Sequence, residues 1–186
     1  MAEEKKDAWL TYLALTTVIL AVCATLSAAR GASFSTKSVM FQAQATNQWA
    51  YYQAKSLKGY LYEIQREALE LEQQKPDSGM TVVKEDKDKP SYPELRQRKI
   101  LEYEEKISKY DEEKQQIQQE GKRLESLRDD AQRHSQIFSM AIVFLQIAIL
   151  LSSVAALMKK RQLWYLGMAV GLIGMFYFAD GFLLFF

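Results

Sequence analysis

The sequence has very few of the residues that build catalytic and metal sites. Among its 186 residues there is one cysteine, Cys23, and one histidine, His134. A single cysteine excludes an intramolecular disulfide, and a single histidine excludes His-rich metal or triad chemistry. The sequence also lacks a Gly-rich phosphate loop, a nucleophile elbow and zinc-ligand spacing. We therefore expect a protein that is not an enzyme and that has no cofactor and no metal.

The chain also lacks a net excess of charge. It has 24 Lys and Arg against 23 Asp and Glu, which gives a formal net charge of +1. Nucleic-acid binding requires a clustered basic excess, so we expect no nucleic-acid partner. The charges are segregated along the chain instead. Residues 30–136 contain 19 basic and 19 acidic residues, whereas residues 8–29 contain none.

Three long apolar runs are present, at residues 8–29, 137–158 and 163–186. A bilayer core about 30 Å thick is crossed by a helix of roughly 20 apolar residues, so each run predicts a transmembrane helix. The lipid bilayer is then a partner of the chain. Residues 159–162 between the second and third runs, three of which are basic, form a turn that is too short for anything but a helical hairpin.

The first apolar run could instead be a cleaved export signal. Residues 1–7 carry three acidic side chains against two lysines, whereas an export signal begins with a positively charged region. The apolar run is also longer than the 7 to 15 residues that are usual in a signal. We therefore expect this segment to be retained as a membrane helix.

The basic residues near the apolar runs predict the orientation of the chain. Lys5 and Lys6 precede the first run, and three basic residues lie in the turn 159–162. The positive-inside rule places both segments in the cytoplasm. Residues 30–136 would then lie outside the cytoplasm, although Arg30 and Lys37 oppose this mildly.

The charged middle segment predicts two long helices. All three prolines of the chain lie in residues 76–93, which we expect to form a tip loop between two arms, residues 30–75 and 94–136. In the first arm, apolar or small residues recur at alternating spacings of three and four, which is typical of a coiled-coil seam. The members of this seam are Met40, Ala43, Asn47, Ala50, Ala54, Leu57, Leu61, Ile64, Ala68 and Leu71.

The second arm repeats this rhythm with Ile100, Tyr103, Ile107, Tyr110, Ile117, Leu124 and Ala131. The two arms have similar lengths, so they can fold back on each other. The predicted fold class is an all-α membrane protein with three transmembrane helices and a long antiparallel coiled-coil hairpin between the first and the second. The tip loop could be disordered or could dock a partner; we favour disorder.

The block WAYYQAKSLK at residues 49–58 follows the first apolar run and lies within the first arm. Together with the paired C-terminal runs, it resembles a family of small bacterial membrane proteins known only as a domain of unknown function. The resemblance covers nearly the whole chain. It implies a bacterial origin and an integral-membrane location, but no activity, substrate or catalytic residue. With the orientation given above, the chain would be a multi-pass protein of the inner membrane, with residues 30–136 in the periplasm.

A second stripe on the first arm is rich in aromatic residues. It lies beside the predicted seam, so a two-helix hairpin would leave it exposed to water. Exposed aromatic rows are typical of contact surfaces, so we predict an interface between subunits. The alternative is a broad core face that the second arm covers. The stripe comprises Phe41, Ala45, Trp49, Tyr52 and Tyr60.

The third apolar run carries Gly167, Gly171 and Gly174. Small residues at this spacing let membrane helices approach closely. Packing within the subunit would account for them, and packing between subunits is the second prediction. We include them in the predicted oligomer interface.

Asp180 is the one ionisable residue within an apolar run. Such residues in membrane helices are costly and suggest an ion or proton site. Asp180 is six residues from the end of the sequence, where we expect water to reach it, so we favour an interfacial or helix-pairing role over an ion or proton role. Its candidate polar partners are Gln146 in the second run and Thr16 with Thr17 in the first, and the depth of the runs predicts that Gln146 lies nearer. Ordinary hydrogen bonds between helices explain these polar residues equally well.

These features predict a self-associating bacterial membrane scaffold that acts through its helical hairpin and has no catalytic activity. The homo-oligomer would organise a complex or hold another envelope protein. One alternative is a subunit of an ion or proton channel that uses Asp180. The other is an accessory subunit that binds an unidentified envelope protein.

Overall fold

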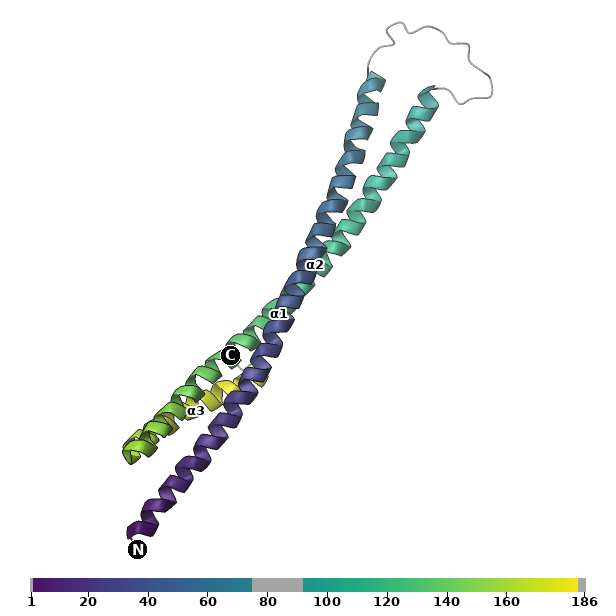
Figure 1. Cartoon of the computed structure of the whole chain (residues 1–186). Helices are drawn as coiled ribbons and strands as arrows, with labels where there is room; N and C mark the ends of the chain where they lie inside the picture. The colour runs from purple at the N-terminus through teal and green to yellow at the C-terminus, as the bar shows by residue number, and fades with distance from the viewer. Residues whose placement is uncertain (1, 75–91, 184–186) are drawn as a thin grey trace. The chain divides into compact units, whose positions relative to one another are not determined.

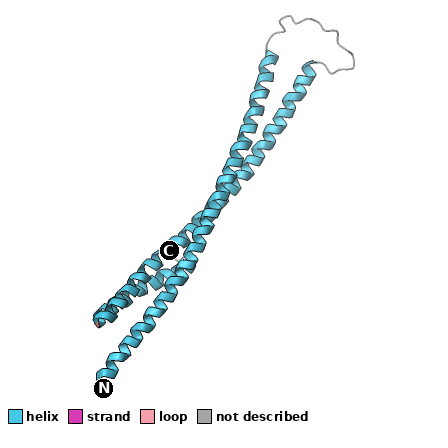
Figure 2. Ribbon diagram, viewed as in Figure 1, coloured by secondary structure: helices cyan, strands magenta, loops and turns pink. Residues whose placement is uncertain are grey.

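The computed structural model describes residues 2–74 and 92–183. Three α-helices make up this part of the chain: α1 (Ala2–Gln74), α2 (Tyr92–Met158) and α3 (Arg161–Leu183) (Figure 1). Within the described residues there is no strand (Figure 2). The all-α prediction is therefore confirmed. Helix α1 continues without a break from the first apolar run into the first arm.

Helix α2 begins two residues earlier than we predicted. Tyr92 and Pro93, which were assigned to the tip loop, already form its first turn. Proline is tolerated there because the first amides of a helix have no intrahelical acceptor. Glu94 lies in the same turn, where a negative charge favours the positive end of the helix dipole. The rest of the tip loop, residues 76–91, lies outside the described residues.

The chain divides into two compact units. Unit 1 comprises Met1–Gln42 with Glu125–Phe186, and unit 2 comprises Ala43–Leu124. Helices α1 and α2 each contribute to both units, whereas α3 belongs to unit 1 alone. Most charged residues of the sequence lie between residues 30 and 136, that is, in unit 2 and the segments of unit 1 next to it in the chain. The surface of unit 2 therefore suits water better than that of unit 1 does.

In unit 1, α3 runs antiparallel to α2 after a short turn. Lys159 follows α2 in the left-handed region, with φ of 54°, and the amide of Lys160 donates to the carbonyl oxygen of Ala155 over 3.2 Å. A bond of this span closes a helix C-terminus and satisfies a carbonyl that would otherwise be unpaired. The basic segment therefore acts as a tight reversal, with α3 starting at Arg161.

Helices of unit 1 meet where side chains are small. A Cβ atom at Gly174 would lie 2.8 Å from Cγ of Leu145, and one at Gly171 would lie 3.1 Å from a terminal carbon of Leu20. Both leucines are buried, and with Ala148 they form the core of this unit. The glycines let the backbones approach closely enough for these leucines to fill the space between helices.

Aromatic residues gather at the end of unit 1 where α3 begins. The rings of Trp9 and Trp164 lie 6.4 Å apart, and the guanidinium of Arg161 lies 5.7 Å from the ring of Trp9. The indole nitrogen of Trp164 donates to the hydroxyl of Thr16 over 3.3 Å. The start of the first apolar run and the turn between α2 and α3 therefore lie at the same end of the unit.

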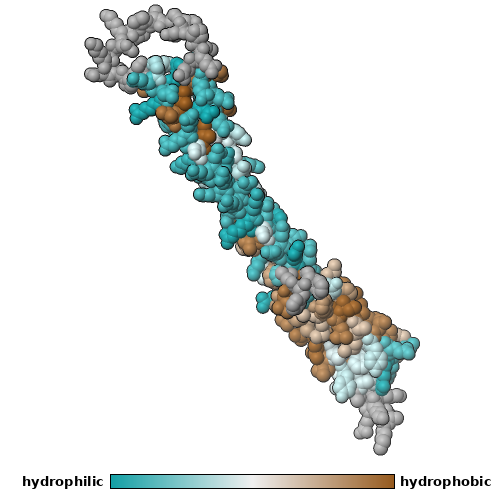
Figure 3. Space-filling model, turned by 180° about the vertical axis from the view of Figure 1, so that it is seen from behind, coloured by the Kyte–Doolittle hydropathy of each residue, from teal (hydrophilic) through white to brown (hydrophobic). Residues whose placement is uncertain are grey.

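All three helices are long and apolar enough to cross a membrane, which indicates membrane association. On the face drawn in Figure 3, apolar side chains cover much of the part that contains α3, and polar side chains cover most of the arms. Large apolar residues such as Val18, Val22 and Leu150 are at least half exposed on unit 1. An apolar exterior of this kind suits contact with lipid.

Several hydroxyl groups in the apolar segments donate to carbonyl oxygens of their own helices. Thr17 donates to the carbonyl oxygen of Leu13 over 2.8 Å, and Ser27 donates to that of Cys23 over 2.8 Å. Ser27 is fully buried. Bonds of this kind, three or four residues back along the helix, let a polar side chain remain in an apolar environment without an external partner.

We expect Leu145→Ala to destabilise unit 1, because it removes a buried side chain that fills the space opposite Gly174. Replacing a buried leucine with alanine costs about 2–5 kcal/mol of unfolding free energy. Thermal melting of the detergent-solubilised protein, followed by its helical circular dichroism, measures the change. The matched control is Leu150→Ala on the same helix, where the side chain is 65% exposed. Equal melting of both variants would contradict the packing described here.

Candidate functional site

The aromatic stripe predicted as a subunit interface lies against α2 within unit 2. Ala45 is 1% exposed, and Trp49 and Tyr52 are partly buried. The ring of Trp49 covers Gly121, where a Cβ atom would lie 3.3 Å from the indole carbon Cε2. The premise of the interface prediction, that this stripe faces water, is therefore wrong. The alternative, a core face covered by the second arm, describes these residues.

One end of the stripe differs from the rest in its exposure. Phe41, which belongs to unit 1, is partly buried. Tyr60 is 59% exposed and remains available on the surface of unit 2. Only Tyr60, among the predicted interface residues of this stripe, therefore keeps the exposure that the prediction assumed.

The predicted seam of the first arm faces away from α2. Its nine members in unit 2 are all exposed, and the four largest are between 52% and 63% exposed. The seam prediction for the first arm is therefore wrong, although the seam predicted for the second arm contains Ile100, Ile117 and Leu124, which are buried. We call the exposed set the outer stripe. It comprises Ala43, Asn47, Ala50, Ala54, Leu57, Leu61, Ile64, Ala68 and Leu71.

Side-chain size explains why α2 meets the aromatic stripe. Five of the nine positions of the outer stripe are Ala or Asn, whereas the other face presents large aromatic rings that bury more apolar area. Tyr62 shows this with ring contacts to both Tyr103 and Tyr110, at 5.5 Å and 5.8 Å between centroids. Gly121 opposite Trp49 supplies the space that the bulkiest side chain needs.

Among the described residues of unit 2, one ion pair joins α1 and α2. The ammonium of Lys55 lies 2.5 Å from a carboxylate oxygen of Glu113 and 5.1 Å from the ring of Tyr110. This hydrogen bond lowers the pKa of Glu113 below its ordinary value and raises the pKa of Lys55. Both side chains are partly exposed, so the pair orients the helices more than it stabilises them.

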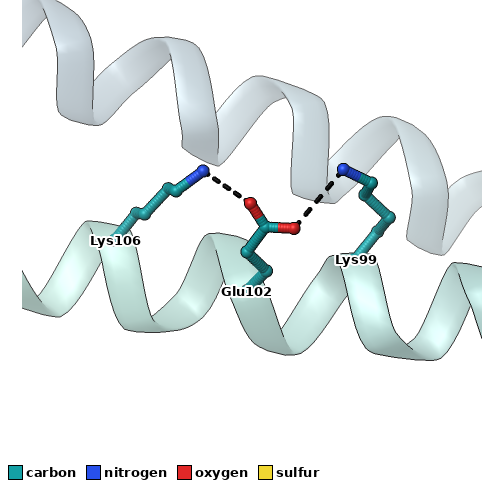
Figure 4. Close-up of polar contacts among 3 residues, drawn as sticks. All are labelled: Lys99, Glu102 and Lys106. Atoms are coloured by element: carbon teal, nitrogen blue, oxygen red, sulfur yellow. Dashed lines mark hydrogen bonds and ion pairs between the residues drawn. The ribbon is translucent and has the colours of Figure 1, made fainter.

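A second charged cluster lies along α2 itself (Figure 4). One carboxylate oxygen of Glu102 lies 2.6 Å from the ammonium of Lys106, and the other lies 3.4 Å from that of Lys99. The hydrogen bond from Lys106 is the main cause of the lowered pKa of Glu102. All three residues lie on one helix at spacings of three and four, so the cluster supports the helix. It does not form a pocket between elements.

The far end of α3 contains the buried carboxylate. Asp180 is 4% exposed, although its position near the end of the sequence predicted contact with water. Next to it, Nδ1 of His134 lies 2.9 Å from the carbonyl oxygen of Gly181. Because a carbonyl oxygen can only accept, this hydrogen bond requires the proton on Nδ1. The imidazole ring stacks on Phe34, with centroids 4.4 Å apart.

Gln146 does not lie at the level of Asp180. A Cβ atom at Gly181 would lie 2.8 Å from the ring of Phe138, so Asp180 is level with this part of α2. Gln146 is exposed and lies roughly two helical turns further along α2. The predicted pairing of these two side chains is therefore wrong. Whether Asp180 has an ion or proton role stays a prediction.

The three glycines of α3 pack within the chain. Gly167 lies against Ser152 and the backbone of Ala148, and Gly171 and Gly174 lie against the leucines of the core. All three glycines are buried. Packing within the subunit therefore accounts for them, and they offer no exposed face to a second copy.

A polar groove of about 660 Å³ lies between α1 and α2 in unit 1. Sequence reasoning did not find it, because its residues come from two helices and follow no motif. Ser135 on its wall donates to the carbonyl oxygen of Gly31 over 3.1 Å. The groove is lined by neutral side chains and contains no titratable residue, so it offers no general acid or base. Its polar lining comprises Ser35, Ser38, Gln132, Ser135, Gln136 and Ser139.

The described residues contain no group of three or more His, Cys, Asp and Glu side chains that could hold a metal ion. Cys23 is a free thiol, partly buried in the first apolar segment. The contacts described in both units serve to pack the helices against one another.

We expect Glu113→Gln to weaken the pairing of α1 and α2 at neutral pH. The pKa of Glu113 is lowered in the folded chain, so its stabilisation is present above the ordinary glutamate pKa. It is lost as the pH falls through the lowered value. The melting midpoint of the variant should therefore lie slightly below that of the native chain at pH 7, and the two should converge in acid. Glu112→Gln, at the neighbouring residue, is the control; the same convergence there would contradict the assignment.

Comparison with known proteins gives a family but no activity. No curated protein and no solved structure matches the sequence. The family model of a domain of unknown function, DUF4337, matches residues 9–184. This range includes α2, α3 and nearly all of α1, in agreement with the resemblance inferred from the sequence. The chain belongs to the DUF4337 family of proteins with a domain of unknown function.

Proposed function

We propose that this protein is a self-associating scaffold of the bacterial inner membrane, with a coiled-coil hairpin that stands outside the lipid and with no catalytic activity. The observation that carries the proposal is the outer stripe on unit 2. Helix α1 packs on α2 through one face, and along the same stretch of chain it presents a second apolar face that is exposed. An exposed apolar row of this length is typical of a contact surface.

The apolar exterior of unit 1 supports the membrane part of the proposal. Its three helices would cross the bilayer, with the turn at residues 159–161 and the N-terminal lysines in the cytoplasm by the positive-inside rule. The paired rings of Trp9 and Trp164 would then lie at the cytoplasmic surface, where such rings are enriched. Unit 2, with its charged side chains, would lie in the periplasm.

The chemistry of the described residues supports a structural role. Many of their charged side chains lie in ion pairs along and between helices, as at Lys55 and Glu113. The groove of unit 1 is lined by neutral side chains. A scaffold requires rigid helices and a contact surface, and the chain supplies both.

Orientation can be tested by cysteine labelling in intact cells. In a Cys23→Ala background, Ser108→Cys on the exposed face of α2 in unit 2 should react with a membrane-impermeant maleimide once the outer membrane is opened. Gln162→Cys near the turn should react only after the inner membrane is permeabilised. Labelling of Gln162→Cys first would place the hairpin in the cytoplasm and overturn this orientation. Release of the protein by alkaline carbonate would overturn membrane insertion.

The buried position of Asp180 favours one second candidate, a subunit of an ion or proton channel. Asp180 is 4% exposed, and an ionisable residue within an apolar helix suggests an ion or proton role. For this candidate, Asp180→Asn should lower proton flux into liposomes that contain the purified protein. Unchanged flux would remove the carboxylate from consideration. The accessory-subunit alternative, in which the hairpin binds another envelope protein, uses the same outer stripe with a different partner.

A further inference from the structure

The outer stripe follows a strict heptad repeat. From Ala43 to Leu71 its members alternate at spacings of four and three without a slip, which gives a mean period of about 3.5 residues. A stripe with this period winds left-handed around a straight helix. Another helix with the same repeat can follow it along its whole length, because the two helices then coil around each other. A flat protein surface would not require such regularity over this length.

The chain itself contains a helix with the required repeat, namely the outer stripe of a second copy. We propose that two copies pair through their outer stripes, parallel and in register, so that Asn47 meets Asn47 of the second copy. This rests on the proposed function, because copies inserted in one bilayer in the same orientation must run in the same direction. The partner in the scaffold is then this chain.

Asn47 supports pairing between identical helices. With Ala43 and Ala50 at the d positions of the heptad, Asn47 occupies an a position. A single asparagine at an a position fixes the register and the number of strands at some cost in stability. Its side-chain amide both donates and accepts, so two copies of Asn47 can satisfy each other. An unrelated apolar helix would leave this amide without a partner.

The residues beside the stripe are compatible with parallel pairing. In that geometry each g position faces the e position of the following heptad of the other copy. Gln53 would face Lys58, and Tyr60 would face Gln65, so neither contact joins like charges. All four side chains are exposed, so they are accessible to a second copy.

The last heptad contains the one unfavourable contact of this flank. Glu67 would face Glu72 of the second copy, and both are exposed. Like charges at facing positions weaken a helix pair modestly. Reversing the charge of one of these two residues should therefore strengthen association. A gain in association is a more specific test than a loss.

Cross-linking in the membrane tests the pairing directly. In the Cys23→Ala background, Ala50→Cys and Ala54→Cys place a thiol at a d and an a position of the outer stripe. Ser108→Cys on the exposed face of α2 is the control. Facing a and d positions bring Cα atoms within disulfide range, so oxidation should convert the two stripe variants to covalent dimers at least about tenfold more than the control.

Two further variants test the chemistry of the interface. Adding Glu72→Lys to Ala54→Cys should raise the yield of dimer, because the introduced ammonium group would then face Glu67 of the second copy. Adding Leu57→Glu and Leu61→Glu should abolish the dimer. Circular dichroism should remain helical in both, since all three substituted side chains are exposed.

Equal cross-linking of the stripe variants and Ser108→Cys would indicate random collision and overturn the proposal. The absence of dimer at both Ala50→Cys and Ala54→Cys would also overturn it. In either case, the labelling of Ser108→Cys described above still reports whether the hairpin lies outside the inner membrane. The scaffold proposal and the pairing proposal can therefore fail separately.

Discussion

Helix packing in this chain depends on glycines that make room for large side chains on the facing helix. Nearly every described residue is helical, so the backbone satisfies its own hydrogen bonds and the side chains alone decide which faces meet. In unit 1, Gly174 makes room for Leu145; in unit 2, Gly121 makes room for Trp49. The same device, a glycine opposite a large side chain, therefore operates in an apolar bundle and in a charged helix pair.

Helix α1 has two apolar faces in unit 2, and this property leads to the proposed function. One face carries the aromatic rings that pack on α2, supported by the ion pair between Lys55 and Glu113. The other face is the outer stripe, with Leu57, Leu61 and Ile64 more than half exposed. A monomer satisfies only the first face. Under the proposed function, the second face would give the hairpin a surface for assembly.

The apolar end near Asp180 combines burial with specific polar contacts. His134 and Ser135 on α2 bond the carbonyl oxygens of Gly181 and Gly31, so α2 is fastened to both other helices there. The stacked rings of Phe34 and His134 add a further contact. These bonds satisfy polar groups close to the boundary between the apolar and charged parts of the chain, where helix packing alone would leave the register less well defined.

Composition and periodicity by themselves determined the all-helical class, the three apolar segments and the second-arm seam around Ile117, whereas the block at residues 49–58, with the paired C-terminal runs, carried the family resemblance. Such features depend on local sequence and solvent preference. The tertiary structure decided which face of α1 meets α2, because both stripes have a helical period and are distinguished by side-chain fit, such as that of Trp49 over Gly121. It also decided that Asp180 is buried and that Gln146 lies elsewhere. The level at which α3 crosses α2 is set by the packing of glycines against leucines, which no spacing along the chain records.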